Sequence, residues 1–283
     1  MATTITKEAL EAHIASFLED YRAAHGIAPI WRAPLAGFAD AHHPLLAKVR
    51  ERIPEHAMPE DVLPGAKTVL VVFVPFSKEL AETNSCAGLA SAQWAKAYED
   101  TNAMFGTMND DLIALLAGHG VRAAVAQAAS TFDREKLVSH WSHRHFAYLA
   151  GLGTFGINNM LITRSGGCGR YTTVVTDLDI TPGQPLETEY CLYKKNGKCG
   201  ACLRRCPTAA LTASDGIGHY DRHKCFAILK KNAEAYQDFG SSYTNEDGTG
   251  SNSVGSEVCG KCTVHVPCAL MAPGGINKQK QCH

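Results

Sequence analysis

Eight of the eleven cysteines in this 283-residue chain lie close together near its C-terminal end. Thiolates are soft ligands that suit zinc, copper and iron–sulfur centres. An odd total fits poorly with a complete disulfide framework, and the N-terminus, MATTITKEALEAH, lacks the basic start and apolar stretch of a secretory signal. We therefore expect a cytoplasmic protein in which clustered thiols stay reduced and bind metal. The eight are Cys191, Cys199, Cys202, Cys206, Cys225, Cys259, Cys262 and Cys268.

The spacing of these cysteines favours iron–sulfur clusters. Cys199 begins a Cys-x2-Cys-x3-Cys-Pro run, which is the back end of the bacterial ferredoxin pattern Cys-x2-Cys-x2-Cys-x3-Cys-Pro. Asn196 stands where that pattern has its first cysteine, and Cys191, five residues upstream, is free to substitute. A second group follows around Cys259-Gly-Lys-Cys262. Two [4Fe–4S] clusters need eight ligands, and this region supplies eight cysteines.

Two other interpretations of the cysteines are less favoured. A zinc site built from the two Cys-x2-Cys pairs would leave Cys206, Cys225 and Cys268 without a role. Disulfides do not suit a reducing compartment. Cys86, Cys168 and Cys282 are expected to be spare thiols, with Cys168 the one of most interest.

Composition limits the function classes. A formal net charge of −1 gives no overall attraction to phosphate, so nucleic-acid binding would need a local basic patch. The longest apolar run, Val69 to Val74, is about a third of the length that a membrane span requires.

The hydrophobic pattern alternates helix and strand up to about residue 180, which predicts a three-layer α/β domain over residues 1–185. Pro182, Gly183 and Pro185 mark its end, and residues 186–283 form a smaller cysteine-rich domain. The tract 240–256 is rich in Gly, Ser and Asn and predicts a surface loop or partial disorder. The expected helices are 6–25, 88–103, 108–117 and 133–149, the expected strands are 67–75, 121–127, 160–163 and 171–177, and 27–66 is expected to be irregular with one short helix.

One segment and the cysteine set together resemble a known family. Ala150-Gly-Leu-Gly-Thr-Phe-Gly-Ile-Asn-Asn-Met-Leu-Ile-Thr163 is similar to the Ala-Gly-Leu-Gly-x-x-Gly-x-Asn-x-x-Leu-Ile signature of the epoxyqueuosine reductases, with the corrinoid reductive dehalogenases as more distant relatives. Tyr171 to Asp177 resembles the strand that follows this signature, and the cysteine pattern, including HYDRHKC up to Cys225, follows the family. Ala92 to Asp100 resembles a family helix only loosely. The resemblance spans about residues 60–270.

The resemblance implies a nitroreductase-like or reductive-dehalogenase-like α/β domain followed by a small α+β ferredoxin-like domain with two clusters. It assigns Cys199, Cys202 and Cys268 to one cluster with Cys191 as fourth ligand, and Cys206, Cys225, Cys259 and Cys262 to the other. It also implies a cobalamin over the nearer cluster. The matching cofactor-lining positions are Gly151, Gly153, Gly156, Asn158 and Asn159, where glycines would let a large macrocycle approach the backbone.

The chain departs from the family pattern at several points. Its first cysteine is displaced to Cys191, and the step from Cys262 to Cys268 is longer than the family's Cys-x3-Cys-Pro. The family's acid has no clean counterpart, and Asp133 is the nearest candidate. The C-terminal helical repeats of members that act on tRNA have no counterpart either, so we expect a substrate smaller than tRNA.

Reduction of a substrate needs a proton donor near the acceptor, and each candidate has a plainer alternative. Asp133 is an acid or a helix cap. His140 and His143, with His145 beside them, are a metal pair, a proton relay or a surface cluster. Tyr98 is a proton donor, as in related dehalogenases, or a core residue, and Cys168 is an axial cofactor ligand or a small buried residue.

The electron source is expected to be a partner protein. Gly151-Leu-Gly153-Thr-Phe-Gly156 matches the letters of a dinucleotide fingerprint, but it follows a helix rather than a strand, which removes the nucleotide-binding geometry. Electrons are therefore expected from a ferredoxin or flavodoxin. The leading hypothesis is an iron–sulfur oxidoreductase that passes single electrons to a corrinoid or directly to a small substrate. The alternative is a non-catalytic electron-transfer or corrinoid-handling protein.

Overall fold

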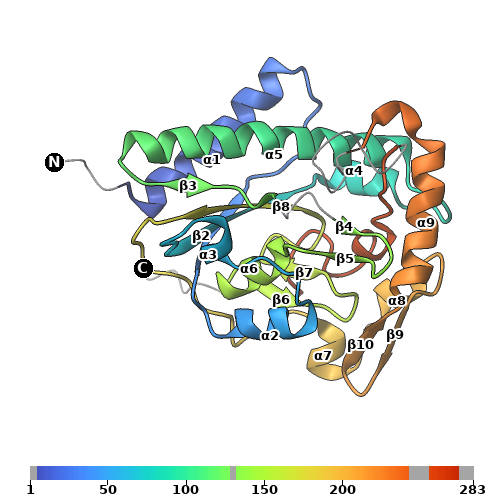
Figure 1. Cartoon of the computed structure of the whole chain (residues 1–283). Coiled ribbons are helices and arrows are strands. Elements are labelled where there is room, and N and C mark those ends of the chain that lie inside the picture. Colours follow the sequence, from blue (N-terminus) through green and yellow to red (C-terminus); the bar gives the residue numbers. More distant parts are fainter. Residues whose placement is uncertain (1–4, 128–131, 242–254, 274–283) are drawn as a thin grey trace, which may run out of the picture.

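A four-stranded antiparallel sheet forms the centre of the protein (Figure 1). The computed structural model describes residues 5–127, 132–241 and 255–273. The strand order is β1 (Leu35–Asp40), β2 (Thr68–Pro75), β8 (Gly169–Thr176) and β3 (Ala123–Ala124). All eight residues of β2 are buried, which confirms the predicted strand at 67–75. The strand lies inside the sheet, and both faces of the sheet are covered. Neither set of its alternating side chains is therefore exposed, which explains the continuous apolar run.

One face of the sheet is covered by two long helices, α1 (Lys7–Ala24) and α5 (Ala92–Gly118). Leu70, Val72 and Val74 of β2 pack on this side in one cluster with Leu10 and Ile14 of α1. The prediction of a helix at 6–25 is confirmed, and Thr6 caps it by accepting a hydrogen bond from the Ala9 amide at 3.2 Å.

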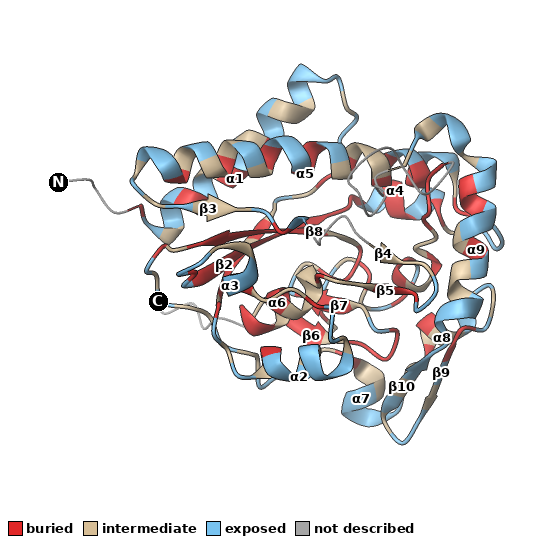
Figure 2. Ribbon diagram, in the orientation of Figure 1, coloured by how far each residue is buried: buried red, intermediate tan, exposed pale blue. Residues whose placement is uncertain are grey.

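The other face of the sheet packs on α6 (His143–Leu149) and its surroundings. Val69, Val71 and Phe73 point this way and join Trp141 and Phe146 in a second core. The short helices α2 (Leu45–Arg52) and α3 (Pro59–Val62) lie on the same side. Buried residues therefore gather along the sheet and on the inner sides of both layers (Figure 2). The α/β class and the three layers are confirmed.

Several expected elements differ from those observed. The segment 27–66 contains β1, α2 and α3 rather than one short helix. The two helices expected at 88–103 and 108–117 are the single helix α5, because Gly106 is accommodated within it, and α4 (Lys78–Thr83) precedes it. The strand expected at 121–127 is reduced to the two residues of β3.

The helix expected at 133–149 is wrong in its first half. Residues Phe132–Asp133 (β4) and Val138–Ser139 (β5) form a small hairpin, and helix α6 begins only at His143. The Asp133 carboxylate accepts hydrogen bonds from the backbone amides of Glu135 and Lys136 at 2.9 and 2.8 Å. A side chain that binds nearby amides in this way stabilises a turn in competition with a helix.

The remaining short elements surround the cysteines. Gly153–Phe155 (β6) and Leu161–Thr163 (β7) form a hairpin from the glycine-rich segment. Val258, Val264 and Val266 share one hydrophobic core with Ile157 and Ile162, so the packing is continuous across the boundary expected at residue 185. That boundary stays a prediction. The other elements are α7 (Leu192–Asn196), α8 (Ala201–Arg205), β9 (Leu211–Ser214), β10 (Ile217–Tyr220), α9 (Arg222–Ala235) and the 3₁₀ helices η2 (Gln237–Phe239) and η3 (Lys261–Thr263).

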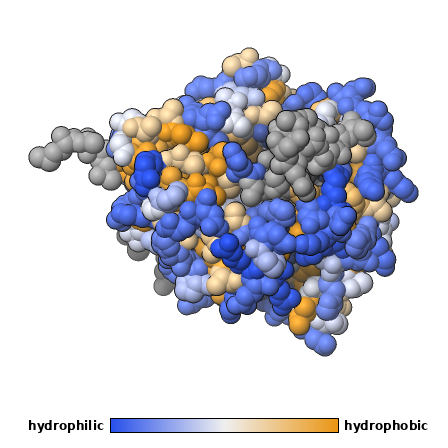
Figure 3. Space-filling model, viewed as in Figure 1, coloured by the Kyte–Doolittle hydropathy of each residue, from blue (hydrophilic) through white to orange (hydrophobic). Residues whose placement is uncertain are grey.

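The face of the protein that Figure 3 shows is mostly polar. Hydrophobic surface on this face lies near the end where α1 and β3 lie. Within the described residues, no helix has the length and apolar character needed to cross a membrane.

Candidate metal centre

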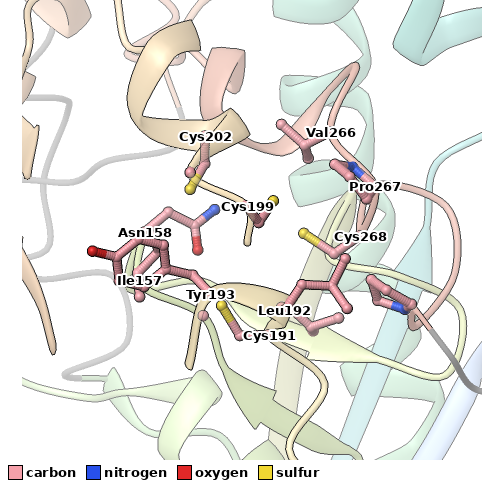
Figure 4. A pocket seen from close by; sticks show the side chains of 14 residues that line it. Ile157, Asn158, Cys191, Leu192, Tyr193, Cys199, Cys202, Val266, Pro267 and Cys268 are labelled. Atoms are coloured by element: carbon pink, nitrogen blue, oxygen red, sulfur yellow. The ribbon is translucent and has the colours of Figure 1, made fainter. Parts of the chain in front are cut away.

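Four cysteines from three separate stretches of the chain line one small pocket, which is partly open to solvent. Figure 4 shows the sulfur atoms of Cys191, Cys199, Cys202 and Cys268 around the same hollow. Apart from these thiols the lining is largely apolar, with Ile157, Ile162, Leu192, Val266 and Pro267 among its residues. Sulfur ligands enclosed by apolar side chains are the surroundings that an iron–sulfur cluster requires.

Short local structures position the four thiols. Cys191 is the N-cap of α7, and the Glu189 carboxylate accepts a hydrogen bond from its amide at 2.7 Å. Cys199 and Cys202 flank Gly200, whose φ of +87° turns the chain into α8. The Gly200 backbone conformation is one that side-chain-bearing residues rarely adopt, which accounts for a glycine between these cysteines. Cys268 arrives from beyond η3, and its carbonyl accepts a hydrogen bond from the Gly167 amide at 2.9 Å.

The pKa values of these thiols show how the donor set would behave without a cation. Burial, followed by the neighbouring Cys191 and Cys199, raises the pKa of Cys202 to about 11. Burial and the neighbouring thiols Cys202, Cys191 and Cys199 raise the pKa of Cys268 to about 12. Four thiolates so close together and so poorly hydrated repel one another. A positively charged core between them would remove that repulsion, so the residues fit a cubane.

The other four cysteines form a second group. Burial raises the pKa of Cys259 to about 11, with further contributions from Cys225 and Cys206. Burial also raises the pKa of Cys262, and its thiol interacts with Cys259, Cys225 and Cys206. The Cys206 sulfur accepts a hydrogen bond from the Ala210 amide at 3.2 Å, and the Tyr220 side chain hydrogen bonds to Cys225.

The two groups are neighbours. Cys262 interacts electrostatically with Cys202 of the first pocket. Asn158 lines that pocket and donates a hydrogen bond from its side-chain amide to the Cys262 carbonyl at 3.0 Å. The loop between β6 and β7 therefore touches both groups.

The competing metal arrangements are not formed. The two Cys-x2-Cys pairs belong to different groups, so they do not build one zinc site. All ten described cysteines are free, and Cys282 lies outside the described residues. Across residues 5–127, 132–241 and 255–273, no three Cys, His, Asp or Glu side chains converge tightly enough to hold a single metal ion.

Two curated proteins share significant sequence similarity with this chain, and no family model matches it. An epoxyqueuosine reductase of Francisella cf. novicida (strain Fx1) is 24% identical over 186 residues, which are 61% of this chain and 46% of that protein. An epoxyqueuosine reductase of Cyclobacterium marinum is 32% identical over 87 residues, which are 30% of this chain and 26% of that protein. The chain is therefore similar in sequence to epoxyqueuosine reductases over part of its length. This confirms the resemblance indicated by the glycine-rich segment and the cysteines, although the chain spans less than half of these relatives.

Solved structures of epoxyqueuosine reductases overlap the chain loosely. One from Bacillus subtilis covers 90% of this chain and 66% of its own, at 16% identity and a TM-score of 0.46. A catabolic reductive dehalogenase covers 68% and 26%, at 20% identity and a TM-score of 0.46. Both TM-scores are below 0.5, so the fold is described here from this chain's own helices and strands alone.

Two glycines of the glycine-rich segment lie against the backbone of the chain itself. A Cβ at Gly151 would lie 2.4 Å from the Gln184 carbonyl oxygen, and one at Gly153 would lie 2.1 Å from the Ile162 carbonyl oxygen. Only Gly156 and Asn158 of the expected cofactor positions line the cysteine pocket. Asn159 adopts a φ of +59°, and its carbonyl accepts a hydrogen bond from Arg144. Gly151 and Gly153 therefore offer no open cradle for a macrocycle.

Asp133 lies in the β4–β5 hairpin rather than at the start of a helix. The two backbone amides that it binds lower the pKa of its carboxyl group, since they stabilise the charged form. Lowering the pKa makes a carboxyl group a poorer reservoir of a proton at neutral pH. Its role as an acid stays a prediction, and the structure gives it a definite part in the turn.

The three histidines do not share one helical face. His140 precedes α6, whereas His143 and His145 lie within it, so the expected i,i+3 pair is wrong. Burial, then Arg170 and Arg144, lowers the pKa of His143 to about 3, and its Nδ1 pairs with the Thr173 hydroxyl at 3.0 Å. Burial and Arg144 lower the pKa of His145 to about 4. Both rings are therefore neutral near pH 7.

Tyr98 and Cys168 are core residues. Tyr98 is 6% exposed on α5, and the Arg170 guanidinium lies 3.8 Å from the centre of its ring. Cys168 is fully buried, and burial raises the pKa of its thiol to about 12. Its amide donates to the Ala269 carbonyl at 3.0 Å, and it is not among the residues that line the cysteine pocket.

Two residues that hold the second group were not foreseen. Lys261, inside Cys259-Gly-Lys-Cys262, is 2% exposed, although lysine is almost never fully buried. Asn84 is fully buried and donates from its side-chain amide to the Cys259 carbonyl at 2.8 Å. The sequence shows a lysine within the cysteine motif, but it does not show that this lysine is buried. Nothing in the sequence around Asn84 indicates its contact with a residue 175 positions away.

Proposed function

We propose that this chain is an iron–sulfur reductase that passes single electrons through two [4Fe–4S] clusters to a small substrate. The observation that supports it is the gathering of eight cysteines into two adjacent groups of four, each from distant stretches of the chain. Cys191, Cys199, Cys202 and Cys268 would hold one cluster. Cys206, Cys225, Cys259 and Cys262 would hold the other.

The protein's own contribution to this chemistry is the environment of the thiols. A cubane, when bound, supplies a centre that accepts and releases one electron. Apolar side chains surround much of the first group, and the Ala210 amide donates to the Cys206 sulfur in the second. Burial and such hydrogen bonds are the means by which proteins set the reduction potential of clusters. The Asn158 side chain fixes the spacing between the groups through the Cys262 carbonyl.

A more specific form of this proposal adds a corrinoid, which would receive the electrons from the clusters and pass them to the substrate. Relatedness to the epoxyqueuosine reductases supports it, and one reductive dehalogenase of similar structure is described as B12-dependent. The filled glycine positions give it no support. Titration of the purified protein with cobalamin tests it, since a bound corrinoid shifts its visible spectrum and elutes with the protein.

The test of the main proposal is an anaerobic preparation of the full chain. We expect about eight irons per chain, from two four-iron clusters, and a brown absorbance that bleaches with dithionite. Zinc in place of iron, or a colourless protein, would refute the proposal. A one-electron donor of the ferredoxin or flavodoxin type is expected to supply the electrons.

A second candidate is a non-catalytic electron carrier that serves a partner enzyme. The lining of the pocket supports it, because the pocket is lined by the four cysteines that would hold a cluster. The two candidates differ in turnover. Only the reductase, supplied with a reduced donor and an oxidised small molecule, would consume donor beyond the electrons that its own clusters store.

A further inference from the structure

Positive charge is concentrated in the segment that carries three of the four thiols of the first group. No acidic residue lies between Glu189 and Asp215, yet this stretch has five cations in a chain whose net charge is −1. A local excess of one sign in an otherwise balanced protein attracts partners of the opposite sign. The five are Lys194, Lys195, Lys198, Arg204 and Arg205.

Four of these cations are exposed, and one of the four, Lys194, is paired with a carboxylate. Lys194 is held by the Phe155 carbonyl at 2.7 Å and the Glu189 carboxylate at 3.3 Å. Arg205 turns inward and donates to the Ser85 carbonyl at 2.7 Å and the Lys261 carbonyl at 3.2 Å. Lys195, Lys198 and Arg204 are exposed, and we name these three residues the α7–α8 basic face.

The basic face lies directly beside the sulfurs. Lys198 precedes Cys199, and the Arg204 guanidinium donates to the Cys199 carbonyl at 3.3 Å. Cys199 itself is partly exposed, while Leu192 and Tyr193 of α7 line the pocket. Figure 1 shows α7 at the lower edge of the protein, and residues of α7 and of the turn before α8 line the pocket, so a partner resting on α7 and α8 would approach the first group.

We propose that the α7–α8 basic face is the docking surface for a small acidic one-electron carrier protein. This inference rests on the proposed function, because it needs a cluster in the adjacent pocket. The carrier gives up one electron and the cluster gains it, so no bond forms or breaks and no proton must move. Electron-transfer encounters are small and transient, and a few charges are enough to steer them.

The alternative partner for a basic surface is RNA, and the face suits it less well. Three outward cations could neutralise about three phosphates, which gives weak and strongly salt-dependent binding. Sequence-specific RNA recognition also uses aromatic side chains that stack on bases, and the aromatic residue of α7, Tyr193, lines the cysteine pocket instead.

The test compares two variants with the same change of charge. Lys195→Glu/Lys198→Glu alters the basic face, and Lys230→Glu/Lys231→Glu alters exposed lysines of α9. The measurement is the stopped-flow bleaching of anaerobic protein by reduced flavodoxin at low and high ionic strength. The first variant should lose about tenfold in second-order rate constant at low ionic strength and approach the wild type at high ionic strength. The second should match the wild type.

Three outcomes overturn the docking proposal. In the first, the rate constant of the Lys195→Glu/Lys198→Glu variant equals that of the wild type. In the second, the α9 variant loses more of its rate constant than this variant does. In the third, a labelled tRNA binds the wild type and not the Lys195→Glu/Lys198→Glu variant, while the rate constants with flavodoxin are equal. Full bleaching of all three proteins by dithionite shows that the clusters are intact and that only docking is being measured. Absence of bleaching in the wild type refutes the proposed function instead.

Discussion

The Lys261 ammonium donates a hydrogen bond to the Asn84 side-chain oxygen at 2.7 Å and to the Asn84 carbonyl at 3.2 Å. Both residues are buried, and Asn84 also donates to the Cys259 carbonyl at 2.8 Å. One asparagine therefore solvates a buried cation and fixes the loop that begins the second cysteine group. The cation lies between Cys259 and Cys262, where it would offset the negative charge of thiolates.

Replacing Asn84 with alanine should destabilise the fold. Asn84→Ala removes a side-chain acceptor from a buried ammonium, which costs about 1–3 kcal/mol. The measurement is the midpoint of anaerobic guanidinium unfolding. Asn84→Asp is the comparison variant, because it keeps an acceptor for Lys261 but loses the donor to the Cys259 carbonyl, so it separates the two contacts. Equal midpoints for Asn84→Ala and wild type would contradict the role given to this contact.

The two cysteine groups should lose iron separately. Cys268→Ser should remove the first cluster and Cys259→Ser the second, so that each variant keeps about four irons per chain. Exposed Cys86 lies in neither group, and Cys86→Ser should keep the wild-type iron content. Iron analysis with electron paramagnetic resonance of the reduced proteins checks this. If Cys268→Ser and Cys259→Ser left the same cluster signal, the division into two groups would be wrong.

The sequence alone was sufficient where local pattern and packing agree. The β2 strand is apolar throughout because both its faces are covered, and α1 is amphipathic because only one of its faces is. The spacing of Cys199, Cys202 and Cys206 is typical of cluster-binding cysteines, so the hypothesis of a metal site follows from the sequence alone. These features depend on neighbours a few residues apart.

Other features depend on contacts that the local pattern does not contain. Residues 133–142 have helical composition, yet the Asp133 carboxylate captures two amides and a hairpin forms. Gly151 and Gly153 resemble a cofactor loop in sequence, but the space beside them is taken by Gln184 and Ile162. Asn84 meets Cys259 only through the tertiary fold.

Gly153 should tolerate no side chain. In Gly153→Ala the new Cβ would lie 2.1 Å from the Ile162 carbonyl oxygen, so the β6–β7 hairpin must separate, at a cost of about 1–3 kcal/mol. Gly106→Ala is the matched control, because nothing lies within 4 Å of its Cβ and α5 should gain up to about 1 kcal/mol from alanine. Thermal unfolding of both variants measures the difference. A Gly153→Ala protein as stable as wild type would show that the hairpin shifts freely, which the paired register of Gly153 with Thr163 argues against.

The partly buried ring of His143 should make stability fall in mild acid. Its pKa is lowered from 6.5 to about 3 in the folded protein. Above pH 6.5 the ring is neutral in both states and contributes no pH dependence. Between pH 6.5 and 3 the unfolded chain binds a proton that the folded protein does not, so stability decreases as the pH falls, by at most about 1.4 kcal/mol per pH unit.

The variant His143→Asn tests this pH dependence, because its side-chain amide can still bind the Thr173 hydroxyl without titrating. Its free energy of unfolding should fall less than that of the wild type between pH 7 and 5. Part of the slope should remain, because burial lowers the pKa of His145 in the same direction, to about 4. His223→Asn, on an exposed histidine of α9, is the control. Parallel curves for wild type and His143→Asn would mean that the ring is hydrated enough to take up its proton while folded, and that α6 is packed less tightly against β8 than its contacts indicate.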